Sequence, residues 1–188
     1  MRFPVLMILL GLVSGCASSD SRLYEDGDPG RLKDGTIRVT TQWTPGEEEG
    51  ADVRVLRARA GKVTCSHISP AHGHFVGEVP EKEWVRLWSR LLAAKPFSRA
   101  RYKVEPPAAQ GGPYHLIRLQ LGEKASMFSA QHRANLLGMF SSKDIVRRLE
   151  LSNAIIKVVS RFATRRLEEA LPDVKKEAGA PGPAGDGR

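Results

Sequence analysis

The chain has 188 residues, of which 41% are hydrophobic, and its 29 lysines and arginines outnumber 21 acidic residues to give a formal net charge of +8. This apolar fraction can build a core, which excludes an intrinsically disordered chain, and the length fits one domain with flanking segments. The excess of positive charge fits contact with anionic lipid headgroups or cell-wall polymers, but solubility and an arginine-rich background composition are the favoured explanation.

The first element is an apolar run behind a short positive start. Met1 and Arg2 precede residues 3–13, FPVLMILLGLV, which are almost wholly apolar. As a helix this run would extend about 16 Å, too short for a bilayer core about 30 Å thick. Its length fits the hydrophobic region of a secretory signal peptide.

The apolar run ends in Val13, Ser14, Gly15 and Cys16. This order, an aliphatic residue, two small residues and a cysteine, resembles the lipobox of bacterial lipoproteins. The resemblance implies that signal peptidase recognises Val13, Ser14 and Gly15 and cuts before Cys16, which then carries the lipid, palmitate included. Two or three acyl chains are enough for stable anchoring. The residues alone also fit an ordinary secretory signal with an incidental cysteine, or a buried first strand.

The residues after Cys16 bear on which membrane the lipoprotein would reach. In lipoproteins of well-studied Gram-negative bacteria, aspartate directly after the cysteine favours the inner membrane, whereas Ala17 and Ser18 stand here. The resemblance therefore implies an outer-membrane lipoprotein whose domain faces the periplasm. With Cys16 lipidated, Cys65 has no intramolecular disulfide partner, and its apolar-alternating surroundings, KVTCSHI, predict a buried strand residue.

The next segments predict a tether and three strands. Residues 16–34 are polar and turn-rich, which predicts a flexible tether. Alternating β-branched and polar residues predict antiparallel strands over 36–43, 53–60 and 62–68. Residues 69–79, SPAHGHFVGEV, are predicted to form a loop.

An amphipathic helix follows, from Pro80 to Pro96, because apolar residues recur at helical spacing. These are Trp84, Leu87, Trp88, Leu91 and Leu92. Strands are predicted over 99–104, 114–122 and 124–132. A last helix begins at Ser141 or Ser142. Its predicted buried stripe comprises Ile145, Leu149, Ile156, Val159, Ala163 and Leu167, widened by Ile155, Val158 and Phe162.

The predicted fold class is therefore α+β, in the order β-β-β-α-β-β-β-α, with the helices on one face or end of an antiparallel sheet. The predicted boundaries are a signal peptide over 1–15, the tether over 16–34, one domain over 35–172 and a disordered tail over 173–188. The tail is predicted from its proline, glycine and alanine content.

Two clusters of side chains are candidate sites. Cys65, His67, His72 and His74 offer thiol and imidazole ligands for zinc or copper, but their spacing matches no standard zinc finger. A polar loop beside a core thiol is the favoured alternative, and no metal or other cofactor is expected. The second cluster is a basic stripe at i, i+4 and i+8 of the last helix, which would either meet an anionic surface or form a solvated helix back. It comprises Lys157, Arg161 and Arg165.

The sequence contains none of the standard signatures for a nucleophilic serine, a zinc protease or a phosphate-binding loop, and it assigns no catalytic residue. The favoured function is a lipid-anchored envelope protein that acts as a non-catalytic binding module, with an envelope protein or an anionic polymer as partner and no nucleic acid. A structural envelope component contacting anionic lipid or cell-wall polymer is the first alternative. A peptidase-inhibitor-like module or an enzyme is the second.

Overall fold

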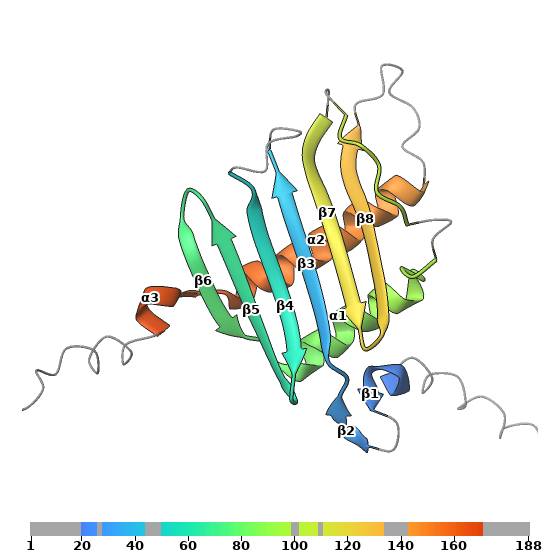
Figure 1. Ribbon diagram of the computed structural model, residues 1–188, viewed down its shortest axis with the longest axis vertical. Coiled ribbons are helices and arrows are strands. Elements are labelled where there is room, and N and C mark those ends of the chain that lie inside the picture. Colours follow the sequence, from blue (N-terminus) through green and yellow to red (C-terminus); the bar gives the residue numbers. More distant parts are fainter. Residues whose placement is uncertain are drawn as a thin grey trace, which may run out of the picture.

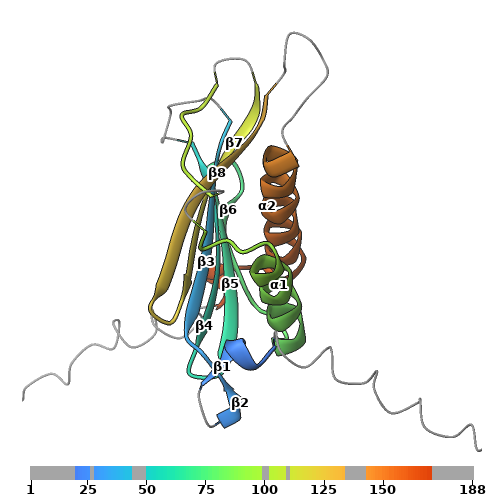
Figure 2. The same ribbon diagram turned by 90° about the vertical axis from the view of Figure 1, so that its right-hand side faces the viewer.

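The computed structural model describes residues 20–25, 28–43, 50–98, 102–108, 111–133 and 143–170. A seven-stranded sheet forms one layer and two helices form a second layer on one of its faces (Figures 1 and 2). Every neighbouring pair of strands is antiparallel, in the order β8-β7-β3-β4-β5-β6-β9. The predicted α+β class, with both helices on one face, is confirmed. The strands are β3 (Gly35–Gln42), β4 (Asp52–Arg59), β5 (Lys62–Ser69), β6 (Gly73–Glu78), β7 (Gly111–Leu121), β8 (Lys124–Arg133) and β9 (Arg165–Arg166).

The order of elements differs from the prediction by one strand in each half. Within the seven-stranded sheet, four strands, not three, precede the first helix, because the predicted loop over 69–79 turns at Gly73 and returns as β6 beside β5. The predicted strand over 99–104 is wrong for residues 102–104, which run along the edge of β8 without forming a strand. Two prolines, Pro106 and Pro107, follow closely and cannot donate ladder hydrogen bonds.

The predicted tether is partly folded. A 3₁₀ helix, η1 (Asp20–Leu23), leads into a two-stranded sheet of β1 (Tyr24–Glu25) and β2 (Asp28–Leu32). Leu23 and Leu32 are buried in the core, and the amide of Lys33 donates to the carbonyl of Leu23 at 2.8 Å. The fold therefore begins at least twelve residues before Gly35. The lipobox with Cys16, and the predicted tail over 173–188, lie outside the described residues.

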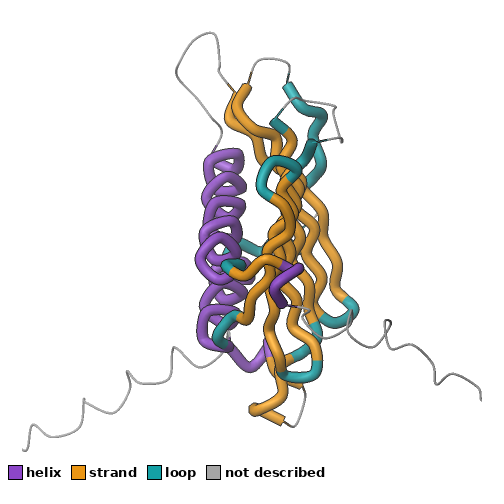
Figure 3. Tube along the Cα trace, turned by 90° about the vertical axis from the view of Figure 1, so that its left-hand side faces the viewer, coloured by secondary structure: helices purple, strands orange, loops and turns teal. Residues whose placement is uncertain are grey.

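The strand register separates two faces of the sheet. Ile37, Leu56 and Leu119 lie on one face and are buried beneath the helices, whereas Arg38 and Arg118 lie on the other face and are exposed. Figure 3 shows the helices and the sheet as separate layers, and among the described residues no helix lies on that second face. We call it the open face. Within the described ranges, no helix covers this face of the sheet.

Two helices supply the other half of the core. Helix α1 (Glu81–Ala93) buries Trp84, Leu87, Trp88 and Leu91, as predicted. The buried stripe of α2 (Lys143–Phe162) is rotated from the predicted one: Ile155 and Val159 are buried, whereas Ile145, Leu149 and Ile156 are only half-buried. The other buried positions of α2 are Arg148, Leu151 and Ser152.

Helix α2 stops at Phe162, and the chain then forms β9 at the edge of the sheet, beside Phe75 and Val76 of β6. Gly77 makes this arrangement possible, because a Cβ atom there would overlap the carbonyl oxygen of Phe162. A short helix, α3 (Leu167–Ala170), follows. Among the described residues, no helix is long and apolar enough to cross a membrane.

Candidate functional site

Three arginines stand side by side on the open face. Arg118 of β7 is directly opposite Arg38 of β3, and Arg57 of β4 lies diagonally from Arg38, opposite Thr36. Directly opposite residues in an antiparallel pair have Cβ atoms about 4.5–5.5 Å apart, and like charges there are destabilising. Within the described ranges, none of the three arginines forms an ion pair with a carboxylate. We call Arg38, Arg57 and Arg118 the arginine row.

A hollow of about 580 Å³ lies at the β8 end of the arginine row. Arg38 and Arg118 line it together with Met127 of β8, whose side chain is 45% exposed. Thr36 and Gln120 add uncharged polar groups. The hollow thus combines cationic groups that have no carboxylate partner among the described residues with an exposed apolar side chain.

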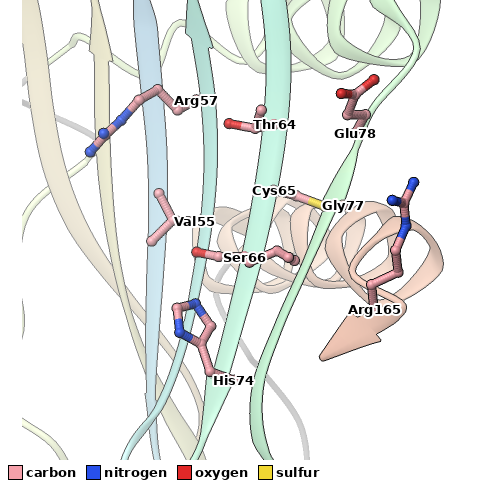
Figure 4. A pocket seen from close by; sticks show the side chains of 10 residues that line it. Val55, Arg57, Thr64, Cys65, Ser66, His74, Gly77, Glu78 and Arg165 are labelled. Atoms are coloured by element: carbon pink, nitrogen blue, oxygen red, sulfur yellow. The ribbon is translucent and has the colours of Figure 1, made fainter. Parts of the chain in front are cut away.

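A second hollow, of about 480 Å³, lies at the other end of the row (Figure 4). Arg57 stands at one side, and Arg165 and Glu78 stand at the other. Val55 and Val76 provide apolar lining, and the hydroxyl side chains of Thr64 and Ser66 lie between the two sides. Cationic, apolar and uncharged polar side chains therefore lie next to one another along the open face, from β8 to β6.

The prediction of a basic stripe on the last helix is wrong for one of its three residues, Arg165. Lys157 and Arg161 are exposed on α2, but α2 ends before Arg165, which lies in β9 and lines the second hollow of the open face. Lys157 and Arg161 instead form a basic surface together with Arg86 and Arg90 of α1. These four cations line one groove of about 240 Å³ between the helices.

The four candidate metal ligands do not come together. Cys65 lies on the helix-covered face of β5, whereas His74 of β6 lies on the open face opposite Ile68, and His72 is exposed in the turn between them. Among the described residues, no group of three or more histidine, cysteine or acidic side chains could hold a metal ion. Cys65 is buried as predicted, and burial raises the pKa of its thiol to about 11. The thiol is therefore protonated at neutral pH.

A buried polar cluster lies on the helix-covered face, where β3, β4, β5 and β7 meet. The hydroxyl of Thr41 and Nδ1 of His115 share a hydrogen bond of 3.0 Å. Arg54 donates to Asp52 at 3.3 Å, and Nε2 of His67 lies 3.7 Å from the same carboxylate. Burial, reinforced by the positive charge of Arg54, lowers the pKa of His115 to about 4 and also lowers the pKa of His67, although Asp52 opposes the shift at His67.

The arginine row was not predicted. Arg38, Arg57 and Arg118 occupy ordinary alternate positions in three strands, and only the pairing of β3 with β4 and β7 makes them neighbours. The local signal was the alternation itself, which places each arginine on the face opposite the apolar residues. No protein-family model and no curated protein matches this chain.

Proposed function

We propose that this protein is a lipid-anchored, non-catalytic binding module of the cell envelope that binds an acidic surface of a partner protein through its open face. The arginine row carries this proposal. It holds like charges in direct opposition on an uncovered sheet face, at a cost in stability that a bound anionic group would offset. An acidic partner surface would supply that charge.

The composition of the open face favours a protein partner. Arginine and methionine are enriched at protein interfaces, and arginine is frequent among the residues that dominate their binding energy. Met127 is exposed between the arginines and the sheet edge, and Val55 and Val76 provide apolar contact area in the second hollow. Both hollows are open depressions on a sheet, which suits contact with a protein surface.

The polar groups of the fold support binding over catalysis. The thiol of Cys65 is buried and protonated, which makes it a poor nucleophile. His115 and Thr41 are hydrogen-bonded to each other under the helices and are buried. The charged groups that line the two hollows of the open face are mainly cations, which recognise an anionic partner; they are Arg38, Arg57, Arg118 and Arg165, against Glu78.

The membrane anchor in this proposal is Cys16, in an outer-membrane lipoprotein whose domain faces the periplasm. Cys16→Ser should abolish incorporation of a palmitate analogue, because the side chain that forms the thioether is lost. The protein should then leave the membrane fraction, and wild-type protein should sediment with outer-membrane markers in a density gradient. Undiminished label on the variant would contradict the anchor. Sedimentation with inner-membrane markers would contradict only the destination.

The open face is tested by photo-crosslinking in intact cells. A photoreactive phenylalanine analogue at position 127 should yield a discrete protein adduct. The double variant Arg38→Glu, Arg118→Glu should reduce that adduct by about tenfold or more, because opposed hot-spot cations become repulsive to an acidic partner. The variant replaces two opposed positive charges by two opposed negative charges, so the repulsion between the two strands is similar in the variant and in the wild-type protein.

The matched control is Lys62→Glu with Lys124→Glu, which makes the same change in net charge at exposed positions beside two hairpin turns. It should leave the adduct intact. An equal loss in both double variants would show that only net charge matters and would overturn the proposed site. Crosslinks to cell-wall polymer with no protein adduct would favour a structural envelope role.

A further inference from the structure

The groove between α1 and α2 is a second basic surface. Both helices lie on one side of the sheet (Figure 2), and the arginine row lies on the other. Arg86 and Arg90 enter it from α1, and Lys157 and Arg161 enter it from α2. All four side chains are exposed. The apolar lining of the groove comprises Leu87, Ala154, Val158 and Phe162.

The groove keeps most of its positive charge. Among the described residues that line the groove, Glu83 is the one acidic side chain; it lies 3.6 Å from Arg86 and can neutralise one of the four cations. Within the described part of the chain, Arg90, Lys157 and Arg161 have no carboxylate partner. Arg161 lies 5.2 Å from the ring centroid of Phe162, a contact that leaves its charge available.

The start of the fold is fixed beside the same helix. Leu23 of η1 is fully buried, η1 contacts α1, and the hydroxyl of Tyr24 donates to Glu81 at 3.0 Å. Glu81 is five positions before Arg86, about 8 Å along the helix axis. The chain therefore enters the fold next to the basic groove.

The short distance from Cys16 to the fold limits where a lipid on that residue could lie. Cys16 is four positions before Asp20, the first described residue, and four residues span at most about 14 Å in any conformation. A lipid attached there holds Asp20, the first residue of η1, within about 14 Å of the membrane surface, and α1 is in contact with η1. The predicted tether of residues 16–34 would have imposed no such limit.

We propose that the α1–α2 groove rests on the anionic headgroups of the membrane in which the protein is anchored. Its four exposed cations meet the lipid phosphates. This orientation rests on the lipid anchor of the proposed function. It directs the open face away from the membrane, toward the partner.

Binding to vesicles tests this surface without the lipid. The protein is the mature chain from residue 16 with Cys16→Ser, and the probes are vesicles of equimolar phosphatidylglycerol and phosphatidylcholine, and of phosphatidylcholine alone. A basic side chain near an anionic membrane increases partitioning about fivefold, so the variant Arg86→Gln, Arg90→Gln, Lys157→Gln, Arg161→Gln should bind the anionic vesicles on the order of 500-fold more weakly.

The matched control neutralises four exposed arginines of the opposite face and gives the same net charge: Arg38→Gln, Arg57→Gln, Arg59→Gln, Arg118→Gln. It should bind anionic vesicles within a few-fold of the parent chain, and near-ultraviolet circular dichroism should confirm that both variants are folded. Phosphatidylcholine vesicles should bind the parent chain much more weakly than anionic ones do.

Three results would overturn the proposal: equal loss of binding in the two variants, equal binding of the parent chain to both kinds of vesicle, or groove-dependent binding to a soluble anionic cell-wall polymer without binding to vesicles. Because the assay uses unlipidated protein, its failure leaves the Cys16 anchor untouched. Failure of palmitate labelling at Cys16 likewise leaves the vesicle result standing.

Discussion

Trp88→Ala is expected to lower the free energy of unfolding by about 3–5 kcal/mol, because it removes a large, fully buried side chain and leaves a cavity. The indole meets Trp84 edge-on, with ring centroids 5.6 Å apart, and stacks on Phe97 at 6.5 Å. Helix α1 packs on the sheet through this aromatic group. Urea denaturation of the mature chain, followed by circular dichroism, measures the change.

Two further variants separate the effect of volume from other causes. Trp88→Phe keeps an aromatic ring and gives up the indole N–H, which has no hydrogen-bond partner among the described groups, so it should cost much less than alanine. Trp43→Ala removes a side chain that is 64% exposed and should leave stability nearly unchanged. A cost for Trp88→Ala no larger than that of Trp43→Ala would show that α1 does not pack on the sheet as described.

The free energy of unfolding should decrease as the pH falls from 6.5 to about 4, because His115 is protonated more readily in the unfolded chain than in the folded protein. Burial and Arg54 lower its pKa from 6.5 to about 4, so in this window the unfolded chain binds a proton that the folded protein does not. The stabilisation is therefore complete above pH 6.5 and is lost on acidification, by about 3 kcal/mol in total. Urea denaturation across the same pH range measures the loss.

The variant His115→Gln should lose less stability than the wild-type chain over that range. Some pH dependence should persist, because the pKa of His67 is lowered in the same direction. His72→Gln, in the exposed turn between β5 and β6, provides the control and should follow the wild-type curve. Parallel curves for wild type and His115→Gln would contradict a neutral, buried His115.

Local patterns predicted α1 well and parts of the sheet less well. The helical spacing of Trp84, Leu87, Trp88 and Leu91 matches the buried face of α1 because one helix face meets one sheet. Strand β6 was missed because Gly73, His74 and Gly77 are weak strand formers, and its pairing with β5 decides its conformation. Tertiary contacts at Leu23 likewise order a polar segment that resembles a linker.

The candidate sites depended even more on contacts distant in sequence. Arg165 was assigned to α2 because the apolar spacing continues to Ala163 and Leu167 without a glycine or proline to end the helix. The end of α2 is set instead by its contact with β6. The α1–α2 groove could not be predicted either, because Arg86 and Lys157 are brought together only by packing of the two helices.

Gly77 also bears on the solubility of the protein. Without β9, β6 would be an edge strand whose free backbone groups could pair with another chain and start aggregation. The missing side chain lets Phe162 approach, which places Arg165 and Arg166 against Phe75 and Val76. At the opposite edge, the amide of Ser129 in β8 donates to Lys103 of the segment that precedes Pro106 and Pro107. The absence of a side chain at Gly77 thus helps to prevent pairing between the sheet edges of neighbouring molecules.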